Sequence, residues 1–293
     1  MTDDHGSTVP RRQLGRALRQ LRTEAQMTLD GVAAALQCSR QKMWRIETGV
    51  GPVRGLDVRA MCELYDVRPE LTAALANLAQ ETRAKGWWHA YGEIVPDWLD
   101  LYGGLESAAR RLREHADVLV PALLQTRGYA SAVLPHRAGM TADDRENLIE
   151  ARLRRQDLLH RRLPPAPRVE VVLSEAVLLR GDGGLATMAE QLRHLVELSR
   201  LPNVSIRVVP LAAGLHADAI AGAFVLLDFP PGSRLDPEPS VVYRESLTGA
   251  LYLDRPTELA AHEQTWASFD TLALDEDQSR RLITKILEEV HHG

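Results

Sequence analysis

The side chains best suited to a chemical role lie in the stretch Ser39–Gly49, which is rich in hydrogen-bond donors. Arginine can donate two hydrogen bonds to guanine, glutamine can pair in the same way with adenine, and lysine can bind a phosphate. The spacing predicts a helix of about three turns that directs Met43 and Ile46 inward. The outer side then carries Arg40, Gln41, Trp44 and Arg45, flanked by Lys42. The stretch therefore predicts a helix that reads DNA; a solvated charged helix is the alternative.

Both ends of this helix carry residues that favour a boundary. The hydroxyl of Ser39 can accept a hydrogen bond from a free backbone N–H at the helix start. Gly49 suits the position just past the C-terminus, where the backbone adopts a left-handed conformation.

The predicted DNA-recognition helix needs neighbouring helices to position it. Residues 13–26 have hydrophobic residues at helical spacing and arginines, including Arg16, around the remaining surface. Thr28 can cap a second short helix, and the brief Gln37-Cys38 link leads directly to Ser39. Two further helices complete the predicted module: residues 56–65 and one that begins at Pro69.

These five helices, with the third one exposed and basic, resemble the helix-turn-helix domain of Xre-type regulators. The matching residues are Leu14–Arg22, Ser39, Lys42, Arg45–Gly49 and Leu64-Tyr65. The resemblance implies binding to double-stranded DNA. A single module this small has too few contacts for specificity against a genome, so we predict a homodimer. We expect Arg16 and Lys42 to bind mainly phosphates. The full set of predicted DNA-binding residues is Arg16, Thr28, Ser39, Arg40, Gln41, Lys42, Trp44 and Arg45.

Length and charge support two dissimilar domains. The chain has 293 residues, 45% of them hydrophobic and 26% charged, which is enough for ordinary globular cores. Residues 1–54 carry nine Lys or Arg and five Asp or Glu, a net charge of +4, although the whole chain has −5. A basic first domain attached to an acidic second one is expected when only one end approaches phosphate. We predict a disordered lead over residues 1–12, a DNA-binding domain over 13–85 and an effector-binding and dimerisation domain over 86–293.

The sequence predicts an α+β protein. After residue 86, alternating or hydrophobic runs predict five strands, and hairpin-length links between them favour a mainly antiparallel sheet covered by helices. No apolar run reaches the length of a membrane span, and the polar N-terminus has no secretory signal. The expected location is the cytoplasm, with association to the nucleoid when the protein is bound to DNA.

The second domain resembles that of the actinobacterial WhiJ-like, antitoxin-like regulators, and this resemblance covers about residues 13–287. It rests on a string of short motifs: Lys85–Trp88, Val120–Thr126, Tyr129-Ala130, Arg152, Arg155-Gln156, Ser174–Leu178, Gln191-Leu192, Pro202–Val204, Val209-Pro210, Gly214, Gly222–Phe224, Glu245–Gly249 and Ser279. The resemblance implies a small protein encoded by a neighbouring gene as the partner. A repressor that senses a small molecule is the alternative within regulation.

Six residues are candidates for effector or partner binding: Trp87, Trp88, Arg152, Glu175, His216 and Phe224. Arg152, Glu175 and His216 could line a polar cavity, or the charged ones could form ion pairs between helix and sheet. The loop 211–221 contains His216 and few other polar side chains. We therefore expect its apolar residues to pack against the core of the domain, a second subunit or a ligand. Trp87 and Trp88 could instead pack within a core or between domains.

The sequence contains no complete set of catalytic residues of a known motif. There is no G-x-S-x-G motif, and His262-Glu263 lacks the second histidine of a zinc protease. The turn Gly181–Gly184 lacks the spacing and the lysine of a nucleotide-binding loop, and the two cysteines lack metal-ligand spacing. We therefore predict no catalytic residue, cofactor or metal; an enzyme with a DNA-binding appendage is the remaining alternative.

Overall fold

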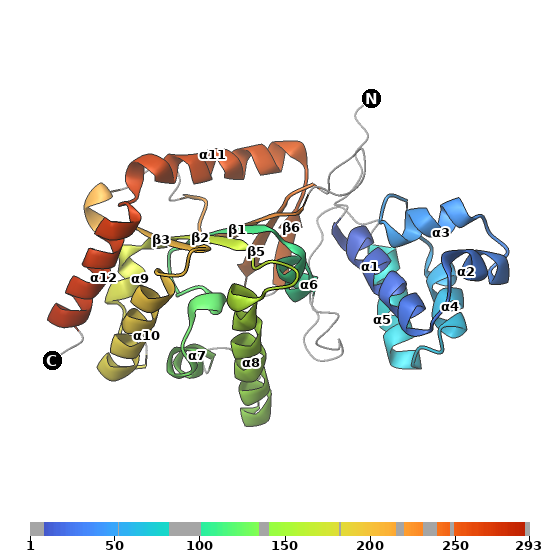
Figure 1. Ribbon diagram of the computed structural model, residues 1–293, viewed down its shortest axis with the longest axis horizontal. Helices are drawn as coiled ribbons and strands as arrows, with labels where there is room; N and C mark the ends of the chain where they lie inside the picture. The colour runs from blue at the N-terminus through green and yellow to red at the C-terminus, as the bar shows by residue number, and fades with distance from the viewer. Residues whose placement is uncertain are drawn as a thin grey trace. The chain divides into compact units, whose positions relative to one another are not determined.

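The computed structural model describes residues 9–51, 53–81, 101–134, 141–181, 183–214, 220–230, 239–246 and 249–290. It is an α+β protein, as the sequence predicts: a helical part is followed by a six-stranded sheet with helices (Figure 1). The contacts within the chain divide it into two compact units, residues 1–105 with 241–259 and residues 106–240 with 260–293.

The described residues of the N-terminal part form five helices, as predicted. They are α1 (Val9–Glu24), α2 (Leu29–Ala35), α3 (Arg40–Glu47), α4 (Gly55–Leu64) and α5 (Pro69–Glu81). The first helix begins at Val9, so residues 9–12 of the predicted disordered lead are helical. Its apolar stripe supplies Leu14, Leu18 and Leu21 to the core, where they are almost completely buried. The other helices add Val32, Met43, Ile46, Val58, Met61 and Leu75 to the buried residues of this part.

The sheet contains six strands in the order β3-β2-β1-β4-β5-β6. Their bounds are β1 (Arg111–Ala116), β2 (Arg168–Ser174), β3 (Val204–Val209), β4 (Phe224–Asp228), β5 (Val241–Ser246) and β6 (Gly249–Leu253). The antiparallel pairs are β1 with β4 and β5 with β6, whereas β1, β2 and β3 are parallel to one another. The sheet is therefore mixed, with an antiparallel character only in its second half.

The parallel half of the sheet includes one strand, β1, that the sequence does not predict. Strand β1 reads Arg-Leu-Arg-Glu-His-Ala, and four of its six side chains are ionisable, so it lacks the hydrophobic character of an inner strand. It nevertheless lies between β2 and β4, with Arg111 opposite Arg168 and Asp228. The connections between β1, β2 and β3 contain helices, which parallel crossovers require.

Helices cover both faces of β1 to β4. Helix α11 (Pro256–Leu272) runs along one face, and α7 (Arg127–Val133), α8 (Ala142–Arg155) and α10 (Leu185–Leu198) lie on the other (Figure 1). Helix α12 (Glu276–Val290) follows α11; its Ser279 is completely buried and accepts a hydrogen bond from the Val208 amide of β3 at 2.9 Å. The remaining helical segments of the described ranges are α6 (Leu101–Ala108), η2 (Ala122–Leu124), η4 (Gln156–His160), α9 (Glu175–Leu179) and η5 (Leu211–Ala213).

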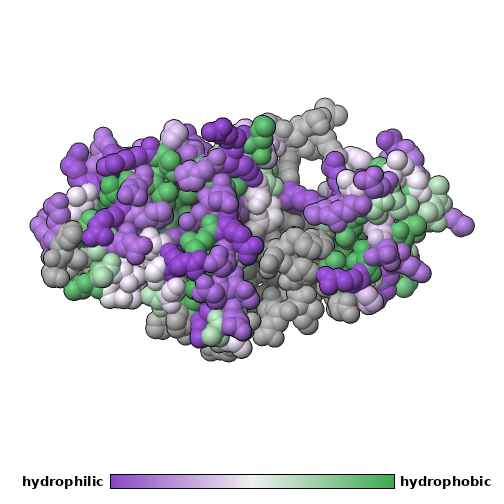
Figure 2. All heavy atoms as spheres, turned by 60° about the horizontal axis from the view of Figure 1, so that its bottom comes forward, coloured by the Kyte–Doolittle hydropathy of each residue, from purple (hydrophilic) through white to green (hydrophobic). Residues whose placement is uncertain are grey.

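The side of the sheet-containing part that carries α7, α8 and α10 is mainly hydrophilic. Figure 2 shows hydrophobic residues on this side as scattered spots among hydrophilic ones. Scattered apolar residues are ordinary for a protein surface.

Candidate nucleic-acid interface and a buried polar cluster

Helices α2 and α3 form two short helices joined by a tight turn, and both are capped by a side chain. The Thr28 hydroxyl accepts a hydrogen bond from the Gly31 amide at 3.0 Å, and the Ser39 hydroxyl accepts one from the Lys42 amide at 3.1 Å. Each cap satisfies a backbone donor that the first turn of a helix leaves free. The predicted helix starts at Thr28 and Ser39 are therefore confirmed.

Helix α3 presents the side that the sequence predicts. Met43 is 1% exposed and Ile46 is 4% exposed, so these residues anchor the helix in the core. The large indole of Trp44 remains 39% exposed. The other exposed side chains of this surface are Arg40, Gln41, Lys42 and Arg45. An exposed helix with several cations, an amide and an aromatic ring has the donors that base and phosphate contacts need.

Two glycines allow α1 to approach α3 closely. A Cβ atom at Gly15 would lie 2.5 Å from the carbonyl oxygen of Ile46. Gly49 has φ +68, and a Cβ atom there would lie 2.6 Å from Cα of Arg12. The Gly49 amide donates to Ile46 O and the Val50 amide to Arg45 O, which is the Schellman arrangement. The predicted role of Gly49 at the end of the helix is confirmed.

A buried ion pair also fixes α3 to α1. Nε of Arg22 donates to Oε1 of Glu47 at 2.6 Å, and Nη2 donates to Oε2 at 3.0 Å. These hydrogen bonds raise the pKa of the Arg22 guanidinium, although burial opposes the shift. Burial also raises the pKa of the neighbouring Tyr65 hydroxyl. The pair sets the position of the C-terminal end of α3.

Two carboxylates that the sequence analysis missed form ion pairs with exposed cationic side chains of α3. Nε of Arg40 lies 3.0 Å from Oδ1 of Asp30, in the first turn of α2. Nζ of Lys42 lies 3.0 Å from Oδ1 of Asp57, in the first turn of α4. Each pair joins residues of different helices, so helical spacing within one element gives no sign of it.

The remaining predicted DNA-binding residues lie around the same part of the fold. Thr28 is exposed at the start of α2, where it acts as the cap. Arg16 lies on α1 and is half-buried. The structure therefore brings most of the predicted set together on α2 and α3, with Arg16 on the helix that supports them.

In the C-terminal part, many of the motif residues meet at one buried turn, Val120–Thr126. Gln191 of α10 is completely buried; its Nε2 donates to Leu124 O at 2.6 Å and its Oε1 accepts from the Thr126 amide at 2.7 Å. The Val120 amide donates to the hydroxyl of Tyr129 at 3.2 Å. Side chains thus supply the hydrogen-bond partners that a buried turn cannot obtain from water.

Helix α8 closes this polar cluster from another side. Nη1 of Arg152 donates to Oε1 of Gln125 at 2.9 Å, and Nε2 of Gln156, directly after α8, donates to Gln125 O at 2.6 Å. Arg155 forms two hydrogen bonds of 2.8 Å with Glu106, whose side chain is 2% exposed. Arg152, a predicted effector residue, therefore supports the turn in the structure. The cluster consists of amides, guanidinium groups, the Tyr129 hydroxyl and a carboxylate, a composition suited to positioning the backbone.

Other predicted effector residues lie in different surroundings. Oε2 of Glu175, the first residue of α9, accepts a hydrogen bond from the Leu211 amide at 2.6 Å. Phe224 is 2% exposed, and its ring packs against His115 and His262 on the side of the sheet that α11 covers. The structure does not join these two residues to Arg152. Trp87, Trp88 and His216 lie outside the described residues.

A second charged cluster, also missed by the sequence analysis, lies beneath α11. Arg113 of β1 is 4% exposed and bonds to Asp228 of β4 and to both oxygens of Glu263. Burial by itself would lower the pKa of Arg113, but the Glu263 and Asp228 carboxylates raise it. The Trp266 ring lies 5.9 Å from the guanidinium carbon. These contacts explain how a strand as polar as β1 occupies the interior of the sheet.

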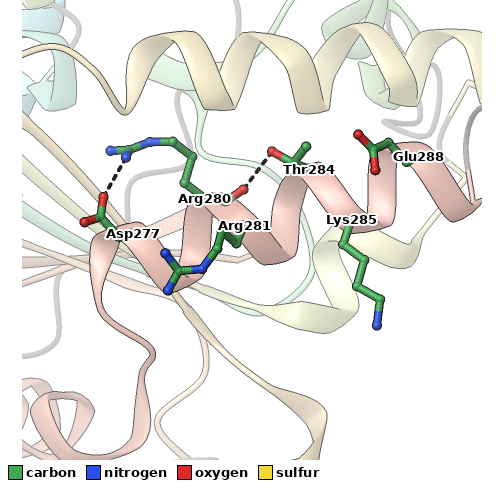
Figure 3. Close-up of a pocket in the computed structure, with 6 residues that line it drawn as sticks. All are labelled: Asp277, Arg280, Arg281, Thr284, Lys285 and Glu288. Carbon is green, nitrogen blue, oxygen red and sulfur yellow. Dashed lines mark hydrogen bonds and ion pairs between the residues drawn. The ribbon is translucent and has the colours of Figure 1, made fainter.

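A hollow on α12 is lined by charged and polar side chains of that helix: Asp277, Arg280, Arg281, Thr284, Lys285 and Glu288. Figure 3 shows Arg281 and Lys285 directed away from Arg280, Thr284 and Glu288. Arg280 is already bound to Asp277 and to Ser199, the residue directly after α10. The hollow is thus an open part of the surface. Within the described ranges, no group of three His, Cys, Asp or Glu side chains is placed to hold a metal.

Comparison with known families agrees with this arrangement. Residues 13–75 match a helix-turn-helix domain, so the chain is a helix-turn-helix regulator. Residues 99–285, which make up most of the chain, match a domain of unknown function, DUF5753. The chain belongs to the DUF5753 family. No curated protein and no solved structure matches it. None of the helices in the described part is long and apolar enough to cross a membrane.

Proposed function

We propose that the protein is a sequence-specific transcriptional regulator that binds double-stranded DNA through α2 and α3. The observation that carries this proposal is the exposed face of α3, with Arg40, Gln41, Trp44 and Arg45 outward and Met43 and Ile46 buried. Helix-turn-helix proteins place the second of these helices in the major groove, where such side chains meet base edges.

Selection from a random duplex library, followed by fluorescence anisotropy, tests the proposal. We expect binding to a selected sequence at least a thousandfold tighter than to scrambled duplex. Arg45→Ala should reduce this preference, whereas an exposed charge of α12, changed in Lys285→Ala, should leave DNA binding unaltered. Equal affinity for selected and scrambled duplexes at physiological salt would refute the proposal.

We further propose that the regulator acts as a symmetric dimer on two half-sites about 34 Å apart, a single helical turn. One module of this size has few base contacts, and two modules together supply the specificity that a genome requires. Light scattering of the protein with its operator should give two chains per duplex. One chain on a single half-site, at concentrations that saturate the operator, would contradict the dimer.

We propose that the C-terminal part binds the small product of a neighbouring gene, as the resemblance to antitoxin-like, WhiJ-like regulators suggests. Support comes from the sheet edge at which β1, β2 and β3 end and β4 begins. Ile220, before β4, is 91% exposed, and Leu211, after β3, is 57% exposed. Val118 and Leu119, after β1, are also exposed. Exposed apolar side chains at one edge are suited to a protein contact.

The test compares operator binding with and without the purified neighbouring-gene protein. In wild type, we expect that protein to change the operator affinity, because it must prefer one of two states of the regulator. Leu211→Ser with Ile220→Ser should abolish this response and leave operator affinity unchanged. A normal response in the double variant would exclude this edge as the contact. A response to a small molecule alone would favour the sensing repressor instead.

A further inference from the structure

The ion pair between Asp30 and Arg40 bridges the two helices of the helix-turn-helix. Asp30 is the second residue of α2 and Arg40 is the first residue of α3. The closest approach of the pair is between Nε of Arg40 and Oδ1 of Asp30, at 3.0 Å, and both side chains are mostly exposed, 71% for Arg40 and 72% for Asp30. The contact therefore lies at the surface where the starts of both helices meet.

This geometry leaves the outer part of the guanidinium for another partner. Arginine has five N–H donors in a planar fork, and Nε supplies one of them. Among the described residues, the carboxylate of Asp30 approaches Arg40 most closely at Nε, and no hydrogen bond engages the terminal nitrogens. Guanine presents O6 and N7 as two neighbouring acceptors in the major groove, a spacing that the end of the fork matches.

We propose that Asp30 is a positioning residue that holds Arg40 for the recognition of guanine at one position of each half-site. This inference rests on the proposed DNA binding and names the base. An exposed arginine without a fixed partner loses considerable rotamer freedom when it binds, and an anchored Nε reduces that loss. The carboxylate also offsets the charge of Arg40, which weakens its attraction to phosphates on any sequence.

A purely local role for Asp30 makes a different prediction. A carboxylate in the first turn of a helix interacts favourably with the helix dipole, and exposed ion pairs contribute little to stability. If Asp30 had only this role, its removal would strengthen binding to all DNA alike by removing a negative charge.

The pair between Asp57 and Lys42 provides a matched control. Asp57 is likewise an acidic residue in the first turn of a helix, and it holds a cation of α3 at the same 3.0 Å. Lysine offers a point charge and no planar fork, so it cannot recognise guanine through two fixed donors. Removal of Asp57 should therefore change affinity without changing base preference.

The experiment measures base preference at every position of a random duplex library for the full-length protein and its variants. Wild type should prefer guanine at one position by about tenfold or more. Asp30→Ala should reduce that preference at least about fivefold, Arg40→Ala should remove it, and the double variant should lose no more than Arg40→Ala alone. Asp30→Asn, which retains an acceptor for Nε, should lose less than Asp30→Ala. Asp57→Ala should keep all preferences within about twofold.

The outcomes separate this inference from the function on which it rests. If Asp30→Ala binds all sequences more tightly and keeps the guanine preference, Asp30 acts by charge alone and the inference is wrong. If wild type shows no sequence preference, the proposed sequence-specific DNA binding is wrong, and the inference about Asp30 is wrong with it. Thermal unfolding of each variant, expected to match wild type because both side chains are exposed, separates loss of preference from loss of folding.

Discussion

The carboxylate of Glu47, the last residue of α3, is bound through both oxygens to the guanidinium of Arg22, in the last turn of α1. The side chains are 6% and 14% exposed. This pair ties one end of the exposed helix to the helix beneath it.

Glu47→Ala should lower the free energy of unfolding of the helical part by about 3 to 5 kcal/mol, because it leaves the buried Arg22 charge without its partner. Urea unfolding followed by circular dichroism measures the change. In the control, Arg22→Met combined with Glu47→Leu, no charge remains buried, and stability should exceed that of Glu47→Ala. Equal stability of Glu47→Ala and wild type would show that the pair contributes nothing.

Gly15→Ala should destabilise the helical part by about 1 to 3 kcal/mol, because the added methyl group would overlap carbonyl oxygens of α3 and push α1 away. Its Cβ would lie 2.5 Å from Ile46 O. Gly51→Ala is the matched control, since its Cβ would meet Arg45 at an ordinary 3.4 Å. Thermal melting should separate the two variants; identical melting temperatures would contradict this close packing.

Gln191→Leu should destabilise the sheet-containing part by about 2 to 4 kcal/mol, because two buried backbone groups, Thr126 N–H and Leu124 C=O, lose their partner. Hydrogen exchange should show faster exchange of the Thr126 amide. Arg193→Met, at an exposed position of the same helix, should change stability by less than about 0.5 kcal/mol. An unchanged exchange rate at Thr126 would mean that water replaces the glutamine.

Stability should also decrease as the pH falls, through His194. Burial lowers the pKa of this histidine below its ordinary value of 6.5, with Glu197 and Glu190 opposing the shift, and Nε2 has no partner within the described residues. Between pH 6.5 and the lowered pKa of the folded state, the unfolded chain binds a proton at His194 that the folded chain does not, so the stability present at higher pH is lost as the pH falls through this range.

Urea unfolding at pH 7.5 and pH 5.5 tests this prediction. His194→Leu should lose less stability than wild type between these pH values, because leucine does not titrate. The same loss in both proteins would assign the pH dependence to other groups.

Helical spacing and capping were enough to predict α3, because both depend on residues close together in the sequence. Met43 and Ile46 are buried and Ser39 and Gly49 mark the ends as expected. The carboxylates of Asp30 and Asp57 could not be predicted in the same way, since their partners lie on other helices.

The same distinction between local and long-range contacts explains which strands of the sheet could be predicted. Five strands have hydrophobic sequences and were predicted, but β1 owes its interior place to Asp228 and Glu263, far from Arg113 in the chain. Without β1, the parallel half of the sheet could not be foreseen. The motifs around Val120–Thr126 were recognised as a string of residues, and only the fold explains them as a single hydrogen-bonded cluster.

The buried turn has a consequence for how the chain is made on the ribosome. Synthesis proceeds from the N-terminus, and Leu124 and Thr126 emerge long before Gln191, their partner 65 or more residues later. The contacts that fix α3, such as Arg22 to Glu47, span 25 residues. The nascent helical part can therefore acquire its native contacts early, while the turn waits for α10 to be translated, and a pause in translation between them would expose the unsatisfied turn to chaperones and proteases.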